Sequence, residues 1–151
     1  MSHIKNCAIC ALRLSLGILF VYAGAVKLVA IANFAKDVKS FQLVPAFLVG
    51  PIAFSLPWLE VGLGALLVAK RLRCVSLLGL LFLMSLFTGA ITSAYCRGIT
   101  ITCGCFGSRA NQTSYQWLFT RDIVILVLLV VVAIHELRAP KPAAPIQENA
   151  P

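Results

Sequence analysis

Residues 74–94 read CVSLLGLLFLMSLFTGAITSA and contain no Asp, Glu, Lys or Arg. At 1.5 Å per residue, a helix of this length crosses the roughly 30 Å of hydrocarbon in a bilayer. Three blocks of similar length and character lie at residues 8–29, 51–69 and 117–134. Long runs of Leu, Val, Ile and Ala favour helices over a closed barrel, the other structure that satisfies its backbone in lipid. The sequence therefore predicts an all-α membrane protein, with four transmembrane helices in an antiparallel bundle.

The composition excludes a soluble enzyme domain. Hydrophobic residues make up 60% of the 151 and charged residues only 12%, about half the usual charged share. So few charges cannot cover a water-soluble globule, and lipid replaces the missing polar surface. The net charge is +8, but much of the excess lies at helix ends, where basic residues set topology. Basic and aromatic residues do not alternate along a surface that could follow a phosphate backbone, so we expect no nucleic-acid partner.

Residues 8–135 are predicted to form one transmembrane domain, followed by a disordered cytoplasmic tail at 136–151. Most of that tail reads APKPAAPIQENAP, which is rich in Pro and Ala and lacks an apolar period. The first block imitates a signal peptide, because Lys5 precedes it and Ala23-Gly24-Ala25 resembles a cleavage site. Its apolar stretch is too long for such a peptide, so we expect it to remain as a helix.

The basic residues of the short loops predict the orientation of the bundle. One side carries Lys5, Arg13, Lys70, Arg71, Arg73, Arg138 and Lys141. The other side carries Lys36, Lys39, Arg97 and Arg109, with Lys27 and Arg121 inside helix ends. The bias towards the first side places both termini in the cytoplasm.

Residues 33–45, between the first two blocks, have the pattern of a short amphipathic helix. Apolar residues recur there at helical spacing, at Phe34, Val38, Phe41 and Val44. Lys36, Asp37 and Lys39 lie off this apolar stripe, Asn33 is a suitable N-cap and Pro45 ends the run. We expect this helix to lie in the outer interface of the membrane, either as an anchor or as a lid that shields the bundle.

Four ionisable residues fall within the apolar blocks, where charge is costly and functional roles are common. These are Lys27, Glu60, Arg121 and Asp122, all in the predicted outer half of the bundle. We expect Glu60 to meet Lys27 or Arg121 in the bundle core. The group forms either an ion-pair cluster that fixes helix register or a polar pocket for a proton relay or a small polar head group.

Helical spacing assigns polar and small residues to one face of each helix. These faces are Arg13, Gly17, Phe20, Gly24 and Lys27 in the first block, Pro57, Glu60 and Gly64 in the second, and Ser85, Thr88, Thr92 and Cys96 in the third. We expect all three faces to point inward, with the glycines allowing close helix approach. Arg13 is an exception, because it lies near the basic inner loop, and we expect it to snorkel to the interface.

The sharpest motif is Cys103-Gly104-Cys105, in the predicted outer loop. Two thiols that flank one glycine can close only a tight ring outside the relaxed disulfide geometry, and such a bond is easily reduced. Arg97 and Arg109 are near enough in sequence to stabilise a thiolate. The spacing predicts a redox-exchange pair, with Cys96 as a third, resolving thiol.

Two alternatives remain open for this loop. One is a structural bridge from Cys96 to Cys103 or Cys105, and the other is a soft metal site. Both histidines, His3 and His135, fall on the opposite side, so we assign no metal ligands. Cys7, Cys10 and Cys74 also fall on that side, and burial alone accounts for them.

Taken together, the motifs resemble the MauE branch of the DoxX-like membrane proteins over about residues 10–135. The resemblance lies in the order of the charged and glycine-bearing first helix, the segment 34–45, the string Leu56-Pro-Trp-Leu-Glu60, then Arg97-Gly98 with Cys-Gly-Cys-Phe-Gly107, and Trp117 with Arg121-Asp122. The pair Cys7 and Cys10, and also Cys74, depart from the pattern of that family.

This resemblance implies a four-helix protein of the bacterial inner membrane that assists methylamine utilisation. It implies maturation of an exported client, the disulfide-rich small subunit of methylamine dehydrogenase, with a thioredoxin-like periplasmic partner. The chain is then a possible thiol–disulfide oxidoreductase, with a quinone as a possible acceptor near Lys27, Glu60 and Arg121. The alternatives are a small membrane carrier or ion-binding protein, and a non-catalytic assembly factor.

Overall fold

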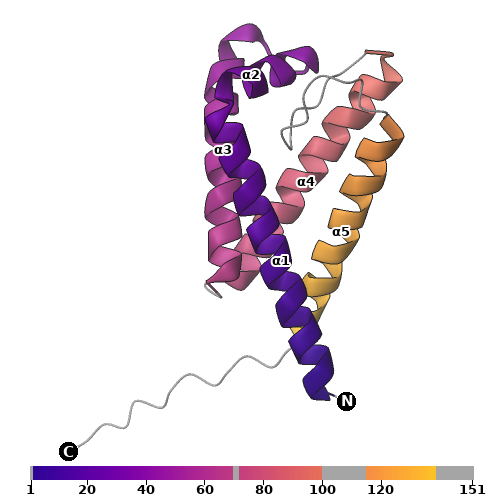
Figure 1. Cartoon of the computed structure of the whole chain (residues 1–151). Helices are drawn as coiled ribbons and strands as arrows, with labels where there is room; N and C mark the ends of the chain where they lie inside the picture. The colour runs from indigo at the N-terminus through magenta and orange to yellow at the C-terminus, as the bar shows by residue number, and fades with distance from the viewer. Residues whose placement is uncertain (1, 70–71, 100–114, 139–151) are drawn as a thin grey trace, which may run out of the picture.

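The computed structural model describes residues 2–69, 72–99 and 115–138 (Figure 1). Within these ranges the chain forms five helices and no strand. The helices are α1 (Ser2–Val29), α2 (Ile31–Ser40), α3 (Ala46–Val68), α4 (Arg73–Cys96) and α5 (Tyr115–Arg138). The predicted all-α membrane fold is confirmed, since α1, α3, α4 and α5 each contain a stretch long and apolar enough to cross a membrane.

The four long helices close into an antiparallel ring. The helix α1 packs against α3, α3 against α4, α4 against α5 and α5 against α1. Each long helix therefore has two neighbours that run the opposite way, and the N-terminal end of α1 lies at the same end of the bundle as the C-terminal end of α5 (Figure 1). The short helix α2 lies at the other end, against α3 and α1.

Several of the predicted helix boundaries were wrong, and α1 begins at Ser2 rather than at Ala8. The second long helix begins at Ala46 rather than at Pro51, because Pro45 is in extended backbone (φ −62°, ψ 150°) and starts the helix, which then continues through Pro51 and Pro57. The last long helix continues to Arg138, so residues 136–138 belong to it and not to a disordered tail. Residues 139–151 lie outside the described part of the chain.

The short amphipathic helix is confirmed, but its start was predicted wrongly. The helix α2 begins at Ile31, and Asn33 lies inside it rather than capping it. Phe34 is buried while Lys36 and Lys39 are exposed, as the amphipathic pattern predicts. The helix ends at Ser40, and Phe41, just after it, is also buried.

Glycines bring α1 and α3 into backbone contact, as the sequence predicted. A Cβ atom on Gly17 would lie 3.0 Å from the carbonyl oxygen of Gly64, and one on Gly64 would lie 2.9 Å from that of Gly17. A Cβ atom on Gly24 would lie 2.8 Å from the carbonyl oxygen of Pro57. Small residues at these points allow the helices to approach closely, which is how helices associate in lipid, where the hydrophobic effect gives no driving force between them.

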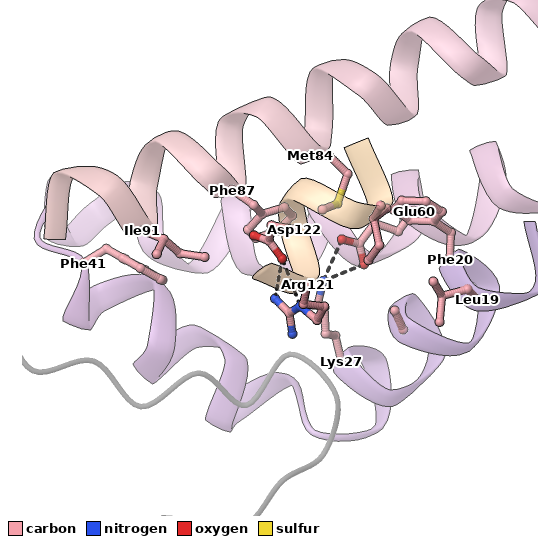
Figure 2. Close-up of a pocket in the computed structure, with 12 residues that line it drawn as sticks. Leu19, Phe20, Lys27, Phe41, Glu60, Met84, Phe87, Ile91, Arg121 and Asp122 are labelled. Carbon is pink, nitrogen blue, oxygen red and sulfur yellow. Dashed lines mark hydrogen bonds and ion pairs between the residues drawn. The ribbon is translucent and has the colours of Figure 1, made fainter. Parts of the chain in front are cut away.

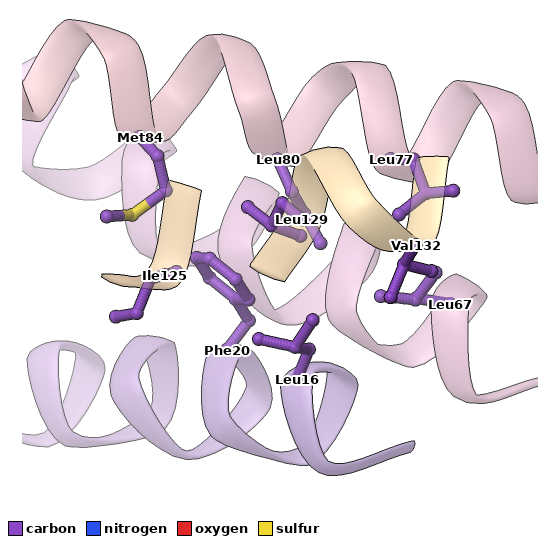
Figure 3. Close-up of a cluster of buried hydrophobic side chains, with 9 residues drawn as sticks. All are labelled: Leu16, Phe20, Leu67, Leu77, Leu80, Met84, Ile125, Leu129 and Val132. Carbon is purple, nitrogen blue, oxygen red and sulfur yellow. The ribbon is translucent and has the colours of Figure 1, made fainter. Parts of the chain in front are cut away.

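The largest apolar core lies in the half of the bundle away from α2 (Figure 3). Its buried members come from all four long helices: Leu16, Phe20, Leu67, Leu77, Leu80, Met84, Ile125, Leu129 and Val132. A smaller cluster of Phe41, Ile91, Ala94 and Leu118 joins the segment after α2 to the facing ends of α4 and α5. Residues of both cores surround the side chains of Lys27, Glu60, Arg121 and Asp122.

The inward face predicted for α4 was wrong. Ser85, Thr92 and Cys96 are exposed, and Thr88 is only half-buried. The hydroxyl groups of Ser85, Thr88 and Thr92 each donate to the backbone carbonyl four residues earlier. Because each hydroxyl is satisfied within its own helix, these residues can face lipid, and apolar residues of α4 occupy the core instead.

Candidate functional site

Lys27 and Glu60 form a buried ion pair between α1 and α3. The Lys27 Nζ atom lies 2.6 Å from Glu60 Oε1 and 2.7 Å from Oε2, and the two residues are 5% and 2% exposed. The structure therefore confirms that Glu60 faces protein and selects Lys27 as its partner rather than Arg121. Because α3 begins at Ala46, Glu60 lies fourteen residues into the helix, about 21 Å from its start at 1.5 Å per residue.

Two aromatic rings enclose the ammonium group of Lys27. Its Nζ atom lies 4.6 Å from the ring centroid of Phe87 on α4 and 5.3 Å from that of Phe34 on α2. Both distances are within the range of cation–π attraction. Lys27 therefore joins four elements at one point, which explains why the short helix α2 packs where it does.

Arg121 and Asp122 pair with each other on α5. The Arg121 Nε and Nη2 atoms donate to Asp122 Oδ1 at 2.9 and 2.8 Å. Asp122 is 1% exposed, and its second oxygen, Oδ2, meets no hydrogen-bond partner within the described part of the chain. The Arg121 side chain is 21% exposed, so this pair connects the buried cluster with the edge of the bundle.

A small cavity of about 30 Å³ lies among these four side chains (Figure 2). Apolar residues complete its wall: Leu19, Phe20, Ala23, Phe41, Met84, Phe87, Ile91 and Ile125. Such a volume holds one or two water molecules, for which a space of about 10–15 Å³ each suffices. The two cations and two carboxylates balance, so the cavity suits water or a shared proton better than an ion.

An apolar groove of about 180 Å³ lies beside this cavity, under α2. Its wall comes from α2, the segment that follows it, α3 and α4, and Phe41 and Phe87 line both spaces. Asp37 is its charged lining residue. The groove was not foreseen from the sequence, because it depends on where α2 crosses the long helices.

Of the predicted thiol residues, the structure describes Cys96 alone. It is exposed and is the last residue of α4. Cys103, Cys105 and Arg109 lie in 100–114, outside the described residues, so their redox role stays a prediction. Arg97 was predicted to stabilise a thiolate; in the structure its guanidinium donates to the backbone carbonyls of Phe41 and Gln42.

The contact made by Arg97 has a clear structural role. Gln42 adopts left-handed backbone (φ 51°), a conformation that is uncommon for a residue other than glycine. The guanidinium binds carbonyl oxygens of this turn and, through Nε, the carbonyl of Ser93. Arg97 thereby ties the segment after α2 to the end of α4, at the point where the cysteine-bearing loop begins.

A second buried charge group lies at the opposite end of the bundle. Arg13 is 2% exposed and lies 3.6 Å from Glu136, which also pairs with Arg73 at 2.9 Å. The prediction that Arg13 snorkels was therefore wrong, because a carboxylate on α5 is available to neutralise it inside the bundle. Sequence reasoning missed Glu136, although it is one of only five acidic residues and follows the last apolar block directly.

Within the described ranges, no three His, Cys, Asp or Glu side chains converge as metal ligands would. At the end of the bundle that carries α2, the structure thus brings together two ion pairs around a small cavity, the groove beside them and the contacts of Arg97 with the segment after α2. The group of Arg13, Glu136 and Arg73 lies at the other end.

Comparison with known proteins identifies the family. Residues 5–135 match the family described as Methylamine utilisation protein MauE. The chain is 31% identical over 124 residues to the MauE protein of Paracoccus denitrificans, covering 82% of this chain and 67% of that protein. It is 37% identical over 108 residues to that of Methylophilus methylotrophus, covering 70% and 57%.

A third relative, the MauE protein of Methylorubrum extorquens, is 38% identical over 87 residues, which cover 57% of this chain and 46% of that protein. The chain thus spans between about half and two thirds of the length of the relatives it matches. No solved structure matches. The match to the family extends over nearly all of the chain, including every residue of the charged cluster, and the chain therefore belongs to the MauE family of multi-pass membrane proteins of methylamine utilisation.

Proposed function

We propose that this protein supports thiol–disulfide chemistry at the outer face of a bacterial inner membrane, in the maturation of an exported protein. The observation that carries the proposal is the Cys103-Gly104-Cys105 spacing in a loop that begins beside the exposed Cys96. A thiol pair around one glycine forms a readily reduced disulfide, which suits exchange better than a structural role.

The described structure supports a fixed base for this loop. The aromatic and aliphatic cluster of Phe41, Ile91, Ala94 and Leu118 packs the ends of α4 and α5 together, and Arg97 ties α4 to the segment after α2. The two helix ends that flank residues 100–114 are therefore held together.

The proposed partners are those that the resemblance to the family implies. The relatives are named for methylamine utilisation, and the proposed client is an exported protein of the type of the methylamine dehydrogenase small subunit. Cys103 and Cys105 would exchange disulfides with a thioredoxin-like periplasmic protein, and Cys96 would resolve the mixed disulfide.

The size of the cavities limits where a quinone could accept electrons. The cavity of about 30 Å³ between Lys27, Glu60 and Arg121 is too small for a ring. The groove of about 180 Å³ under α2 is large enough, because an apolar cavity of about 150 Å³ holds benzene. A quinone acceptor therefore fits beside Phe87 and Phe41 and not between the ion pairs.

One observation favours a second candidate, a non-catalytic assembly factor. Lys27 with Glu60, and Arg121 with Asp122, are neutralised in pairs within a nearly closed space. Paired intramembrane charges can fix helix register without carrying anything. For the same reason we do not favour a carrier, since an ion would find no unbalanced charge there.

Maturation of the client by variants in which one cysteine is replaced tests the proposal. We expect Cys103→Ser and Cys105→Ser to abolish it, because serine keeps the size and polarity of cysteine but cannot exchange. Cys74→Ser is the matched control, since Cys74 is exposed at the other end of the bundle, and it should leave maturation unchanged. Normal maturation in both loop variants would reject thiol chemistry there and favour the assembly factor.

A further inference from the structure

The pair Cys7-x-x-Cys10 lies at the end of the bundle opposite the cluster of Lys27, Glu60, Arg121 and Asp122. The proposed function does not use this pair. The two residues are three apart on α1, so their side chains share one helix face. Cys7 and Cys74 are exposed and Cys10 is half-buried, so the expectation that burial accounts for these cysteines was wrong. Arg13, three residues further on, continues the same face into the bundle.

Arg13 directs a hydrogen-bond donor at Cys10. Its Nη2 atom lies 3.7 Å from Cys10 Sγ, while its Nη1 atom lies 3.6 Å from Glu136 on α5. The Nε atom of Arg13 is buried without a hydrogen-bond partner among the residues the structure describes. A guanidinium with donor capacity to spare, beside a thiol, stabilises the negative charge that sulfur carries when it attacks or leaves a disulfide.

Arg73 shares the carboxylate that Arg13 contacts. It pairs with the other oxygen of Glu136 at 2.9 Å, so one carboxylate faces two guanidinium groups. Of these two guanidinium groups, that of Arg13 contacts Cys10. A cysteine that serves only as a small packing residue needs no such surroundings.

We propose that Cys7 and Cys10 form a second thiol–disulfide exchange site, which reacts with disulfides on the side of the membrane where α1 begins. Cys10 is the attacking thiol, because Arg13 contacts its sulfur, and the exposed Cys7 resolves. Seventeen residues separate Cys10 from Lys27 on α1, about 25 Å along the helix. The pair also lies at the opposite end of the bundle from Cys96, the last residue of α4.

The exchange balances with a small disulfide such as glutathione disulfide. The Cys10 thiolate attacks one sulfur of that disulfide, whose S–S bond breaks as the Cys10–glutathione bond forms and the first glutathione leaves as a thiolate. The Cys7 thiolate then attacks Cys10 Sγ and releases the second glutathione. Two electrons pass from the cysteines to glutathione disulfide, and the two protons lost by the cysteines end on the two glutathione thiols.

Closing the ring requires a local change in α1. Side chains three apart on a helix have Cβ atoms about 5–6 Å apart, whereas a disulfide needs about 3.5–4.5 Å. The N-terminal turns of α1 extend past the ends of α3 and α4 (Figure 1), and both Cys7 and Ala8 are exposed. The turn that carries Cys7 must therefore tighten towards Cys10 for the bond to form.

The test uses the full chain in lipid nanodiscs with Cys96, Cys103 and Cys105 replaced by Ser, so that its result is independent of the proposed function. After equilibration with glutathione disulfide, peptide mass spectrometry should find a Cys7–Cys10 disulfide. In the Cys7→Ser variant the reaction should stop at Cys10 bound to glutathione. Formation of no Cys7–Cys10 disulfide at any ratio of oxidised to reduced glutathione would overturn the proposal.

Alkylation rates test the role of Arg13. With iodoacetamide at pH 7, Arg13→Gln should slow alkylation of Cys10 about tenfold, the effect of losing one hydrogen bond to a charged group, and leave the rate of Cys74 unchanged. Arg73→Gln is the matched control, since Arg73 contacts Glu136 alone in this group, and Arg13→Lys should recover part of the rate. A rate at Cys10 that stays constant or rises in both Arg13 variants would contradict the assignment of Cys10 as the attacking thiol.

Discussion

Lys27 and Glu60 neutralise each other where either charge alone would be costly. Both are at least 95% buried, and the carboxylate accepts hydrogen bonds from the ammonium group at 2.6 and 2.7 Å. Removing one partner of a buried pair leaves an uncompensated charge, which costs about 3–5 kcal/mol, whereas replacing both partners by apolar residues is often neutral. Stability measurements on variants therefore show what the ion pair contributes to the fold, apart from any role in chemistry.

We predict that Glu60→Gln lowers the free energy of unfolding by about 3 kcal/mol or more, because Lys27 is left buried without a carboxylate. Thermal unfolding in detergent measures the change. The double variant Lys27→Met with Glu60→Leu is the control and should recover most of the stability. Wild-type stability in Glu60→Gln alone would mean that the pair contributes nothing to the fold.

The same double variant also distinguishes structure from function. If the ion pair only fixes helix register, the double variant should mature the client normally once it folds. If the pair holds water or a proton for the chemistry, a stable double variant should be inactive. Client activity at equal protein level in the membrane decides between these outcomes.

At the residue scale, the sequence identified the charged candidates but not all of their partners. Lys27, Glu60, Arg121 and Asp122 could be predicted because ionisable residues stand out in apolar blocks, and they do line one cavity. The partner of Glu60 could not be predicted, since Arg121 turned to its own neighbour Asp122. The burial of Arg13 depends on the length of the last helix, which was predicted too short to include Glu136.

Two glycines on α3 differ in whether they contact α1. A Cβ on Gly64 would lie 2.9 Å from the carbonyl oxygen of Gly17, whereas a Cβ on Gly62 would meet nothing within 4 Å. We predict that Gly64→Ala lowers the thermal stability, because the two backbones must separate, and that Gly62→Ala leaves it equal or higher. Equal losses in both variants would contradict a specific role for the contact with α1, because helix propensity alone would raise the stability of both.

Arg97 determines how firmly α2 and the segment after it are held. We predict that Arg97→Gln increases hydrogen exchange in residues 31–44 without changing exchange in α5, because the bonds to the carbonyls of Phe41 and Gln42 are lost. Lys39→Gln is the matched control, since Lys39 is a basic residue exposed on α2 itself. If exchange in this segment is the same in both variants, α2 is held by Phe34 and Phe41 alone.

At the scale of elements, periodicity predicted which helices exist. It assigned the wrong inward face where side-chain hydroxyls bond to the backbone of their own helix. The stripe of Ser85, Thr88 and Thr92 on α4 looked like a polar interior face, yet each hydroxyl bonds within the helix. The start of α2 was misplaced because Asn33 is a good cap by residue type, while the structure begins the helix two residues earlier. Such choices depend on packing that no local pattern contains.

The bundle as a whole places the beginning of α1 and the end of α5 together, with α2, the end of α4 and the beginning of α5 at the other end. The antiparallel arrangement could be predicted from four apolar blocks joined by short segments. The side of the membrane that each end faces follows from the Lys/Arg bias alone and stays a prediction.

We predict that a periplasm-active reporter fused after Pro151 is silent and that one inserted near Gly98 is active. The reason is the larger number of Lys and Arg residues at the end where α1 begins. Enzyme activity of each fusion, compared at equal expression, is the measurement. The reverse pattern would place the loop cysteines in the cytoplasm, where thiols are kept reduced, and would remove the basis for maturation of an exported client.

The central claim, exchange by Cys103 and Cys105, is tested most directly by trapping a mixed disulfide. In a Cys96→Ser background, which lacks the proposed resolving thiol, the cysteine that remains after Cys105→Ser or Cys103→Ser should retain its partner covalently. On a diagonal gel, run first without and then with reductant, at least one single variant should release a disulfide-linked partner protein. The double variant should release none. A partner that persists in the double variant, or none in either single variant at normal protein level, would contradict the account.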